Sequence, residues 1–186
     1  GLWSEVLARL HRSLDGAGID TTPTPWTAHV DDASGLHGSA CVLPLLAWGY
    51  HRDHARWLRA CATWEREGLP LANPARVLAW NSDKRYLLEL EAEDLARIAP
   101  TRLVGQDDAA DLDELIEQLG SADLVVKPAV SLSAHGTWRV ASLGRPQARA
   151  RFAGQVRQQD LLVQRYLPQI EEEGEISFVF LGGLYS

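Results

Sequence analysis

Residues 123–130 read DLVVKPAV, and a lysine stands at position 127 inside this otherwise apolar stretch. The chain carries 18 basic residues, of which only Lys84 and Lys127 are lysines. A lysine ammonium is a compact and flexible point charge, whereas the arginine guanidinium is a planar fork. Such a point charge suits a tight pocket for phosphate. The stretch therefore predicts a strand whose lysine binds a phosphate group.

The composition indicates a folded protein of one domain or two small ones. Of the 186 residues, 46% are hydrophobic and 23% are charged, which allows a sizeable core. The net charge of -7 and the lack of a basic stripe argue against a nucleic-acid partner. No apolar run approaches the roughly 18 residues of a membrane span, and no signal peptide is visible. We therefore expect a cytoplasmic protein with no membrane partner.

The two cysteines and the two chain ends give further expectations. Cys41 and Cys61 stand in apolar surroundings without metal-like spacing, which favours two buried thiols. The sequence contains no methionine, and its last stretch, ISFVFLGGLYS, reads as a hairpin whose second strand has only begun. We therefore expect a fragment of a longer protein.

Two amphipathic helices are predicted in the first third of the chain. Apolar spacing favours one helix that begins at an N-cap, Ser4, and ends near Gly16 or Gly18. A second helix is predicted over residues 51–67. Its buried face comprises Trp57, Ala60, Cys61 and Trp64.

Two strands are predicted on either side of that second helix. Residues 40–48, ACVLPLLAW, form a continuous apolar run that is typical of a strand covered on both faces. Residues 69–73, LPLAN, follow the helix as a short strand. Because strand and helix alternate here, the first 72 residues predict a small α/β domain with parallel pairing.

The rest of the chain predicts a second set of helices and strands. Helices are expected over residues 73–93, 108–120 and 145–159, the first of them containing Lys84. Strands are expected at 99–104, 123–130, 137–143 and 161–168. We place domain boundaries after residues 72 and 167, which gives domains 1–72, 73–167 and 168–186.

A small-residue loop, SLSAHGT, follows the strand that carries Lys127. Its hydroxyl donors, Ser131, Ser133 and Thr137, and its backbone N–H groups suit an anion. Gly136 lacks the Cβ that would block close approach. Together with Lys84 and Lys127, this loop predicts a site for phosphate.

Each feature also has a structural explanation. A lone lysine on a strand is usually a salt-bridge partner or part of a solvated edge, and SLSAHGT resembles an ordinary loop. Residues 171–175, EEEGE, are typical of a solvated turn, and His135 is typical of a surface residue. Together, the order and spacing of the features favour the functional interpretation more strongly than any single feature does.

In this order the motifs resemble the ATP-grasp superfamily of ligases. NPARVLAWNSDKRYL is similar to the segment with its first ATP-binding lysine, and LVVKPAVSLSAHGT to its second lysine and phosphate loop. LLVQRYLPQIEEEGEISFVFLGG is similar to its adenine hinge and the next sheet. The sequence is similar to the bacterial subgroup that contains the D-cycloserine-forming cyclo-ligase, which is related to glutathione synthetases and ribosomal-protein glutamate ligases. The resemblance implies an α/β (α+β) ATP-grasp fold, truncated and preceded by a parallel α/β domain.

The resemblance also implies the residues that bind ATP. Lys84 and Lys127 would contact its phosphates, and the loop residues Ser131, Ser133, Gly136 and Thr137 would cover them. Gln164, where relatives often have glutamate, would lie beside the adenine amino group. Arg165, Tyr166 and Leu167 would supply backbone contacts of the hinge. Glu175 would hold the ribose, with Glu172 and Glu173 as alternatives.

The resemblance implies an ATP-dependent ligase that joins a small-molecule carboxylate to an amine through an acyl phosphate. Its Mg²⁺ ligands and its catalytic residues are expected beyond Ser186, so no metal ligand is assigned here. Some relatives form homo-oligomers. Three alternatives stay open. The first is an ATP-grasp kinase or carboxylase, and the second is an ATP-binding module without turnover. The third is a plain α/β domain whose two lysines are a coincidence.

Overall fold

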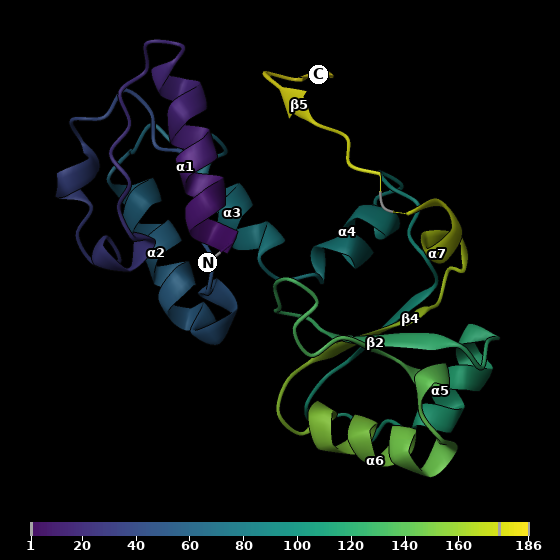
Figure 1. Cartoon of the computed structure of the whole chain (residues 1–186). Helices are drawn as coiled ribbons and strands as arrows, with labels where there is room; N and C mark the ends of the chain where they lie inside the picture. Colours follow the sequence, from purple (N-terminus) through teal and green to yellow (C-terminus); the bar gives the residue numbers. More distant parts are fainter. Residues whose placement is uncertain (1, 175, 186) are drawn as a thin grey trace. The chain divides into compact units, whose positions relative to one another are not determined.

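The computed structural model describes residues 2–174 and 176–185 (Figure 1). The chain divides into two compact units. The first unit comprises Gly1–Tyr86 and Val130–His135, and the second comprises Leu87–Ala129 and Gly136–Ser186. The domain boundaries after residues 72 and 167 concern the intact protein and stay predictions.

The first unit is helical. Its α-helices are α1 (Leu2–Asp15), α2 (His54–Arg66) and α3 (Ala75–Asn81). Its 3-10 helices are η1 (Trp26–Ala28), η2 (Ser34–Leu36) and η3 (Tyr50–Arg52). The predicted N-cap at Ser4 is wrong, because α1 already includes Leu2 and Trp3 and so places Ser4 inside the helix. The helix ends directly before Gly16, as expected.

The core of the first unit is built on the face of α2 that the sequence predicted. Trp57, Ala60, Cys61 and Trp64 are all buried. The rings of Trp57 and Trp64 meet edge to face with their centroids 5.5 Å apart, a favourable aromatic geometry. Asp53 caps the helix by accepting a hydrogen bond from the Arg56 N–H. Burial of each large side chain contributes about 1.5–3 kcal/mol.

The strand predicted over residues 40–48 is wrong. Only an isolated parallel bridge forms, between Val42 and Leu71, while Leu43 and Leu45 are 41% and 55% exposed. Pro44 has no N–H and restricts the residue before it, so the ladder ends at Val42. The predicted parallel pairing is thus reduced to one bridge.

The two cysteines differ in exposure, which corrects half of the prediction. Cys61 is buried, whereas Cys41 is exposed. Cys41 stands at the edge of the apolar run. Because this run does not form the predicted strand, the side chain of Cys41 is not buried as the prediction required. Burial raises the pKa of the Cys61 thiol to about 12, which keeps it protonated and unreactive at neutral pH.

The long helix predicted over residues 73–93 is two short helices, α3 and α4 (Tyr86–Ala92). Lys84 lies in the turn between them and not in a helix. Side chains explain the break, since they offer the backbone an alternative to helical hydrogen bonds. The Ser82 hydroxyl donates to the Ala79 carbonyl (2.6 Å), and the Asp83 carboxylate accepts from the Arg85 N–H (3.0 Å).

The second unit contains a four-stranded antiparallel sheet of order β1-β4-β2-β3. Its strands are β1 (Thr101–Val104), β2 (Leu124–Pro128), β3 (Trp138–Arg139) and β4 (Leu161–Arg165). All four strands were predicted, as were the helices α5 (Leu112–Leu119) and α6 (Arg145–Val156). A 3-10 turn, η4 (Val140–Ser142), follows β3.

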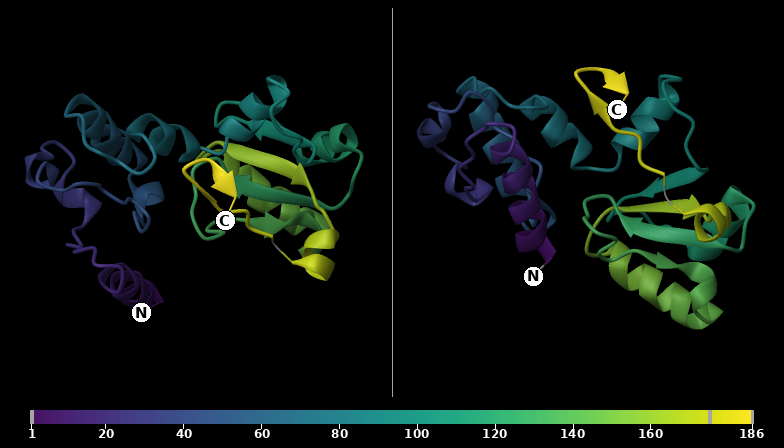
Figure 2. Two further views of the ribbon diagram at one scale, coloured as in Figure 1. Left: turned by 90° about the horizontal axis from the view of Figure 1, so that it is seen from above. Right: turned by 45° about the horizontal axis from the view of Figure 1, so that its top comes forward.

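One face of this sheet packs on α5 and α6, which Figures 1 and 2 show on the same side of the strands. The core on this face includes Leu124, Val126, Leu161 and Val163 from the strands and Phe152 from α6. Side chains alternate along a strand, so the residues between them point to the opposite face. Lys127 and Gln164 belong to that opposite face.

The C-terminal part contains a short helix and a hairpin. Residues 171–173 of the predicted turn belong to an exposed helix, α7 (Gln169–Glu173), whose first turn carries carboxylates where the helix dipole favours them. A hairpin of β5 (Phe180–Leu181) and β6 (Leu184–Tyr185) follows, as predicted. Glu175, the predicted ribose ligand, lies outside the described residues. None of the helices in the described part of the chain is long and apolar enough to cross a membrane.

Candidate nucleotide-binding site

The first unit brings together Lys84 and Ser131, two of the predicted phosphate-binding residues. The Lys84 ammonium donates hydrogen bonds to the Ser131 carbonyl (2.7 Å) and to its hydroxyl (2.8 Å). The Tyr50 hydroxyl donates to the same carbonyl at 3.4 Å. Ser131 is 4% exposed. Lys84 therefore holds the start of the predicted phosphate loop in place.

The middle of the loop has an unusual backbone. Ser133 and Ala134 adopt φ values of +52° and +56°, and His135 donates its N–H to the Leu132 carbonyl (3.0 Å). Ser133 and His135 are exposed, which confirms the prediction that His135 is a surface residue. Two left-handed residues in a row are uncommon outside glycine and mark a tight turn.

The hydrogen bonds at Ser131 lead to a prediction for the loop. Replacing Ser131 by alanine removes one acceptor of a charged donor, worth about 1.5 kcal/mol. Amide hydrogen exchange of residues 132–135 should then accelerate by roughly tenfold. Ser133→Ala, an exposed change in the same loop, is the control and should leave the rates unaltered. Equal rates in Ser131→Ala and the unmodified chain would show that the bond from Lys84 to the Ser131 hydroxyl does not hold the loop.

Gly136 has a packing role in the second unit. It adopts a φ of +74°, and a Cβ at this position would lie 2.9 Å from Cγ of Pro128. Its carbonyl accepts a hydrogen bond from the Gln155 amide (2.8 Å), and Gln155 in turn accepts from the Trp138 indole (2.7 Å). The end of the loop is thus fixed between β2 and α6. Thr137, the next predicted residue, is half-buried.

Lys127 is a half-buried cation on β2. Its partner across the sheet is Leu162 of β4. Burial lowers the pKa of Lys127, so the fold disfavours its charged form. Among residues 2–174 and 176–185, no carboxylate forms an ion pair with it. A charge kept in such a place without a protein anion is typical of a site that binds an anionic ligand.

The predicted adenine hinge lies where β4 ends. The Arg165 N–H donates to the Pro100 carbonyl and the Tyr166 N–H donates to the Asp123 carbonyl, both at 3.0 Å. Both N–H groups are already bonded to protein carbonyls. The backbone groups left for the predicted contacts with adenine are therefore the hinge carbonyls and those of Leu167. Gln164 is half-buried and directly opposite Thr101 of β1.

A polar network that the sequence did not predict holds the Tyr166 ring. The Arg139 guanidinium lies 3.6 Å from the centre of that ring. It also pairs with Asp123 at 2.6 Å and with Glu171 at 2.7 Å. The Tyr166 hydroxyl donates a hydrogen bond to Glu171, and this bond raises the pKa of Tyr166. No spacing in the sequence links these residues, since they come from four separate segments.

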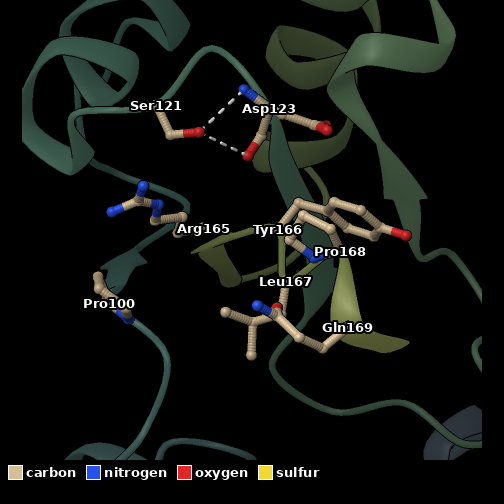
Figure 3. Close-up of a pocket in the computed structure, with 8 residues that line it drawn as sticks. All are labelled: Pro100, Ser121, Asp123, Arg165, Tyr166, Leu167, Pro168 and Gln169. Atoms are coloured by element: carbon tan, nitrogen blue, oxygen red, sulfur yellow. Dashed lines mark hydrogen bonds between the residues drawn. The ribbon is translucent and has the colours of Figure 1, made fainter. Parts of the chain in front are cut away.

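A shallow hollow of about 380 Å³ lies beside the hinge (Figure 3). Its lining residues are Pro100, Ser121, Asp123, Arg165, Tyr166, Leu167, Pro168 and Gln169. Ser121 fixes one wall, because its hydroxyl bonds both the carbonyl and the N–H of Asp123. Gln164 does not line it, since alternation along β4 turns Gln164 and Arg165 to opposite faces.

The described residues hold no evident metal site. Within residues 2–174 and 176–185, no group of three or more His, Cys, Asp or Glu side chains is arranged to hold a metal ion. These residues alone therefore do not fit a Mg²⁺ site.

Comparison with solved structures identifies the fold. The crystal structure of a D-cycloserine synthetase, DcsG, matches 95% of this chain with a TM-score of 0.74 and 23% sequence identity. The chain has an ATP-grasp fold. The prediction of an ATP-grasp fold of mixed α/β class is thereby confirmed. The chain spans 59% of the length of that synthetase.

An ATP-grasp RimK domain protein from Sphaerobacter thermophilus is 19% identical over 61% of this chain and 42% of its own, with a TM-score of 0.48, too low to support an argument. No protein-family model and no curated protein matches the sequence. The assignment of the fold therefore rests on the match to the synthetase.

Proposed function

We propose that the intact protein is an ATP-dependent ligase that joins a small-molecule carboxylate to an amine. The ATP-grasp fold supports this proposal, as does the likeness to an enzyme named for D-cycloserine synthesis. The single observation that carries it is Lys127, a half-buried cation for which no partner carboxylate is found among the described residues. The phosphates of a nucleoside triphosphate would supply a negatively charged partner for Lys127.

The residues have separate roles in this proposal. Lys84 and Lys127 neutralise the phosphates, and the loop of residues 131–137 closes over them to exclude water. Lys84 is bonded to Ser131 in this structure, so ATP must exchange one partner of that ammonium for phosphate oxygens. Gln164 faces the adenine, and Leu167 and the hinge carbonyls bond its edge. Glu175 remains the proposed ribose ligand.

The chemistry proceeds in two steps. A carboxylate oxygen of the substrate attacks the terminal phosphorus of ATP, which gives an acyl phosphate and releases ADP. The amine then attacks the carbonyl carbon, loses a proton and expels phosphate. The protein contributes position and charge stabilisation, as in other phosphoryl transfers. Mg²⁺ stays an expectation of the resemblance, as do the cytoplasmic and bacterial setting and a homo-oligomer.

Product analysis tests the proposal. The intact protein is supplied with ATP, Mg²⁺ and a panel of carboxylates paired with amines, and the release of ADP is followed. Ligation predicts one amide for each ADP released, with no ADP when the amine is present alone. A stable phosphorylated product would instead identify a kinase. ATP binding without turnover on any pair would identify a binding module.

A further inference from the structure

Gln164 is the proposed neighbour of the nucleobase, and its amide group can be placed in two ways that look alike but differ chemically. One end of the amide donates hydrogen bonds and the other accepts them. If the oxygen faces the ligand, the site selects a base with an exocyclic amino group, as in adenine. If the nitrogen faces the ligand, the site selects a base with an exocyclic oxygen.

Thr101 decides between the two placements. The Thr101 hydroxyl donates its only proton to the Ala99 carbonyl at 2.6 Å. Its oxygen therefore has only lone pairs left for other partners. Gln164 lies directly across the sheet from Thr101, and its amide nitrogen donates to that oxygen at 2.7 Å. The reverse placement would bring two acceptors together at this distance.

These two hydrogen bonds, from Thr101 to Ala99 and from Gln164 to Thr101, leave the amide oxygen of Gln164 turned away from Thr101. Within the described ranges 2–174 and 176–185, no donor bonds to Gln164 Oε1. Thr101 is 5% exposed, so water does not compete for its hydroxyl. The adjacent Arg165 N–H is bonded to the Pro100 carbonyl at 3.0 Å, which holds the segment of Thr101 against the end of β4.

We propose that Thr101 is a positioning residue that orients the Gln164 amide to accept a hydrogen bond and so makes the site select 6-amino purines over 6-oxo purines. This proposal rests on the proposed function, because it assumes that a nucleoside triphosphate binds at the end of β4. Thr101 itself does not touch the nucleotide. Its effect passes through the side chain of Gln164.

The test compares ATP with inosine triphosphate, which carries an oxygen in place of the 6-amino group and a hydrogen on N1. Dissociation constants for both are measured by calorimetry on the intact protein. The unmodified protein should bind ATP at least about tenfold more tightly than inosine triphosphate, the worth of one good hydrogen bond. In Thr101→Val the amide is free to turn, so the preference for ATP over inosine triphosphate should fall by about threefold or more, because either placement of the amide then costs little.

Two variants separate orientation from stability. Thr101→Ser keeps the hydroxyl and should restore the ratio of the unmodified protein. Gln164→Glu presents only acceptors and should favour ATP even when combined with Thr101→Val. This double variant keeps the proposal testable if Thr101→Val alone binds poorly.

The outcomes distinguish the two proposals. If the unmodified protein binds neither nucleotide, the proposed function fails. If ATP binds but Thr101→Val retains the full preference for ATP, the role of Thr101 fails and the proposed function stands. If the unmodified protein prefers inosine triphosphate, the assigned orientation is wrong.

Discussion

Lys127→Met should lower the affinity of the intact protein for ATP by about 100-fold, which corresponds to about 2.7 kcal/mol. A unit charge about 4 Å from a phosphate contributes on the order of 4 kcal/mol at an effective dielectric of about 20, before desolvation is subtracted. Methionine is similar in length and shape, so the change removes mainly the charge. Calorimetric titration with ATP measures the effect.

The same variant should not destabilise the fold. Burial lowers the pKa of Lys127, which means that the folded state disfavours its ammonium. The unfolded state thus binds the proton more readily, and stability should rise with pH between the lowered pKa and the ordinary one. Below that window the buried charge opposes folding. We therefore expect the free energy of unfolding of Lys127→Met at neutral pH to equal or exceed that of the unmodified chain.

Two further variants complete this test. Arg102→Met removes an exposed positive charge from β1 of the same sheet and should leave ATP affinity within about twofold. Lys127→Arg keeps the charge but replaces a point by a planar fork, so it should recover only part of the affinity. Unchanged ATP binding in Lys127→Met would refute the phosphate role. Full activity of Lys127→Arg would refute the argument that a compact charge is required.

Gly136→Val should lower the free energy of unfolding by about 3 kcal/mol, with one part from strain at positive φ and one part from overpacking. Gly136 has a φ of +74°, which a β-branched residue adopts only with strain. Its new side chain would start 2.9 Å from Pro128, a ring that cannot turn away. Urea unfolding measures the loss.

Gly120→Val is the matched control in the same unit. Gly120 has a φ of +61°, and nothing lies within 4 Å of a Cβ built there. This variant carries the backbone strain without the contact at Pro128, so it should lose about 1–2 kcal/mol less than Gly136→Val. Equal losses at the two positions would show that Pro128 does not constrain the loop end.

Local patterns predicted most of the second unit correctly. The strands β2 and β4 alternate or run apolar between clear turn signals, and α5 ends at Gly120, which has the positive φ of a helix C-cap. In the first unit, the apolar face of α2 was predicted residue by residue. These elements satisfy their own periodicity, so the sequence alone suffices for them.

The errors arose where one residue overrides a pattern. Pro44 prevents a strand in an otherwise apolar run. Ser82 and Asp83 end α3 by bonding the backbone and place Lys84 in a turn, although the apolar spacing continues on both sides. A hydrophobic pattern registers burial, whereas these interruptions depend on hydrogen bonds of single side chains.

The candidate site was predictable only in part. The loop and the two lysines have local signals and were named from the sequence. Two features depend on pairings between strands that are distant in the sequence. They are the ion-pair network around Arg139 and the hydrogen bonds that join Ala99, Thr101 and Gln164. Such pairings follow from the register of the sheet, which no short motif specifies.

We propose that the ammonium groups of Lys84 and Lys127 both bind the triphosphate of one ATP molecule. A crystal structure of the intact protein with a non-hydrolysable ATP analogue tests this claim most directly. We expect both ammonium nitrogens at hydrogen-bond distance, about 2.7–3.2 Å, from phosphate oxygens of one nucleotide. A nucleotide bound elsewhere, or one that only a single lysine contacts, would contradict it.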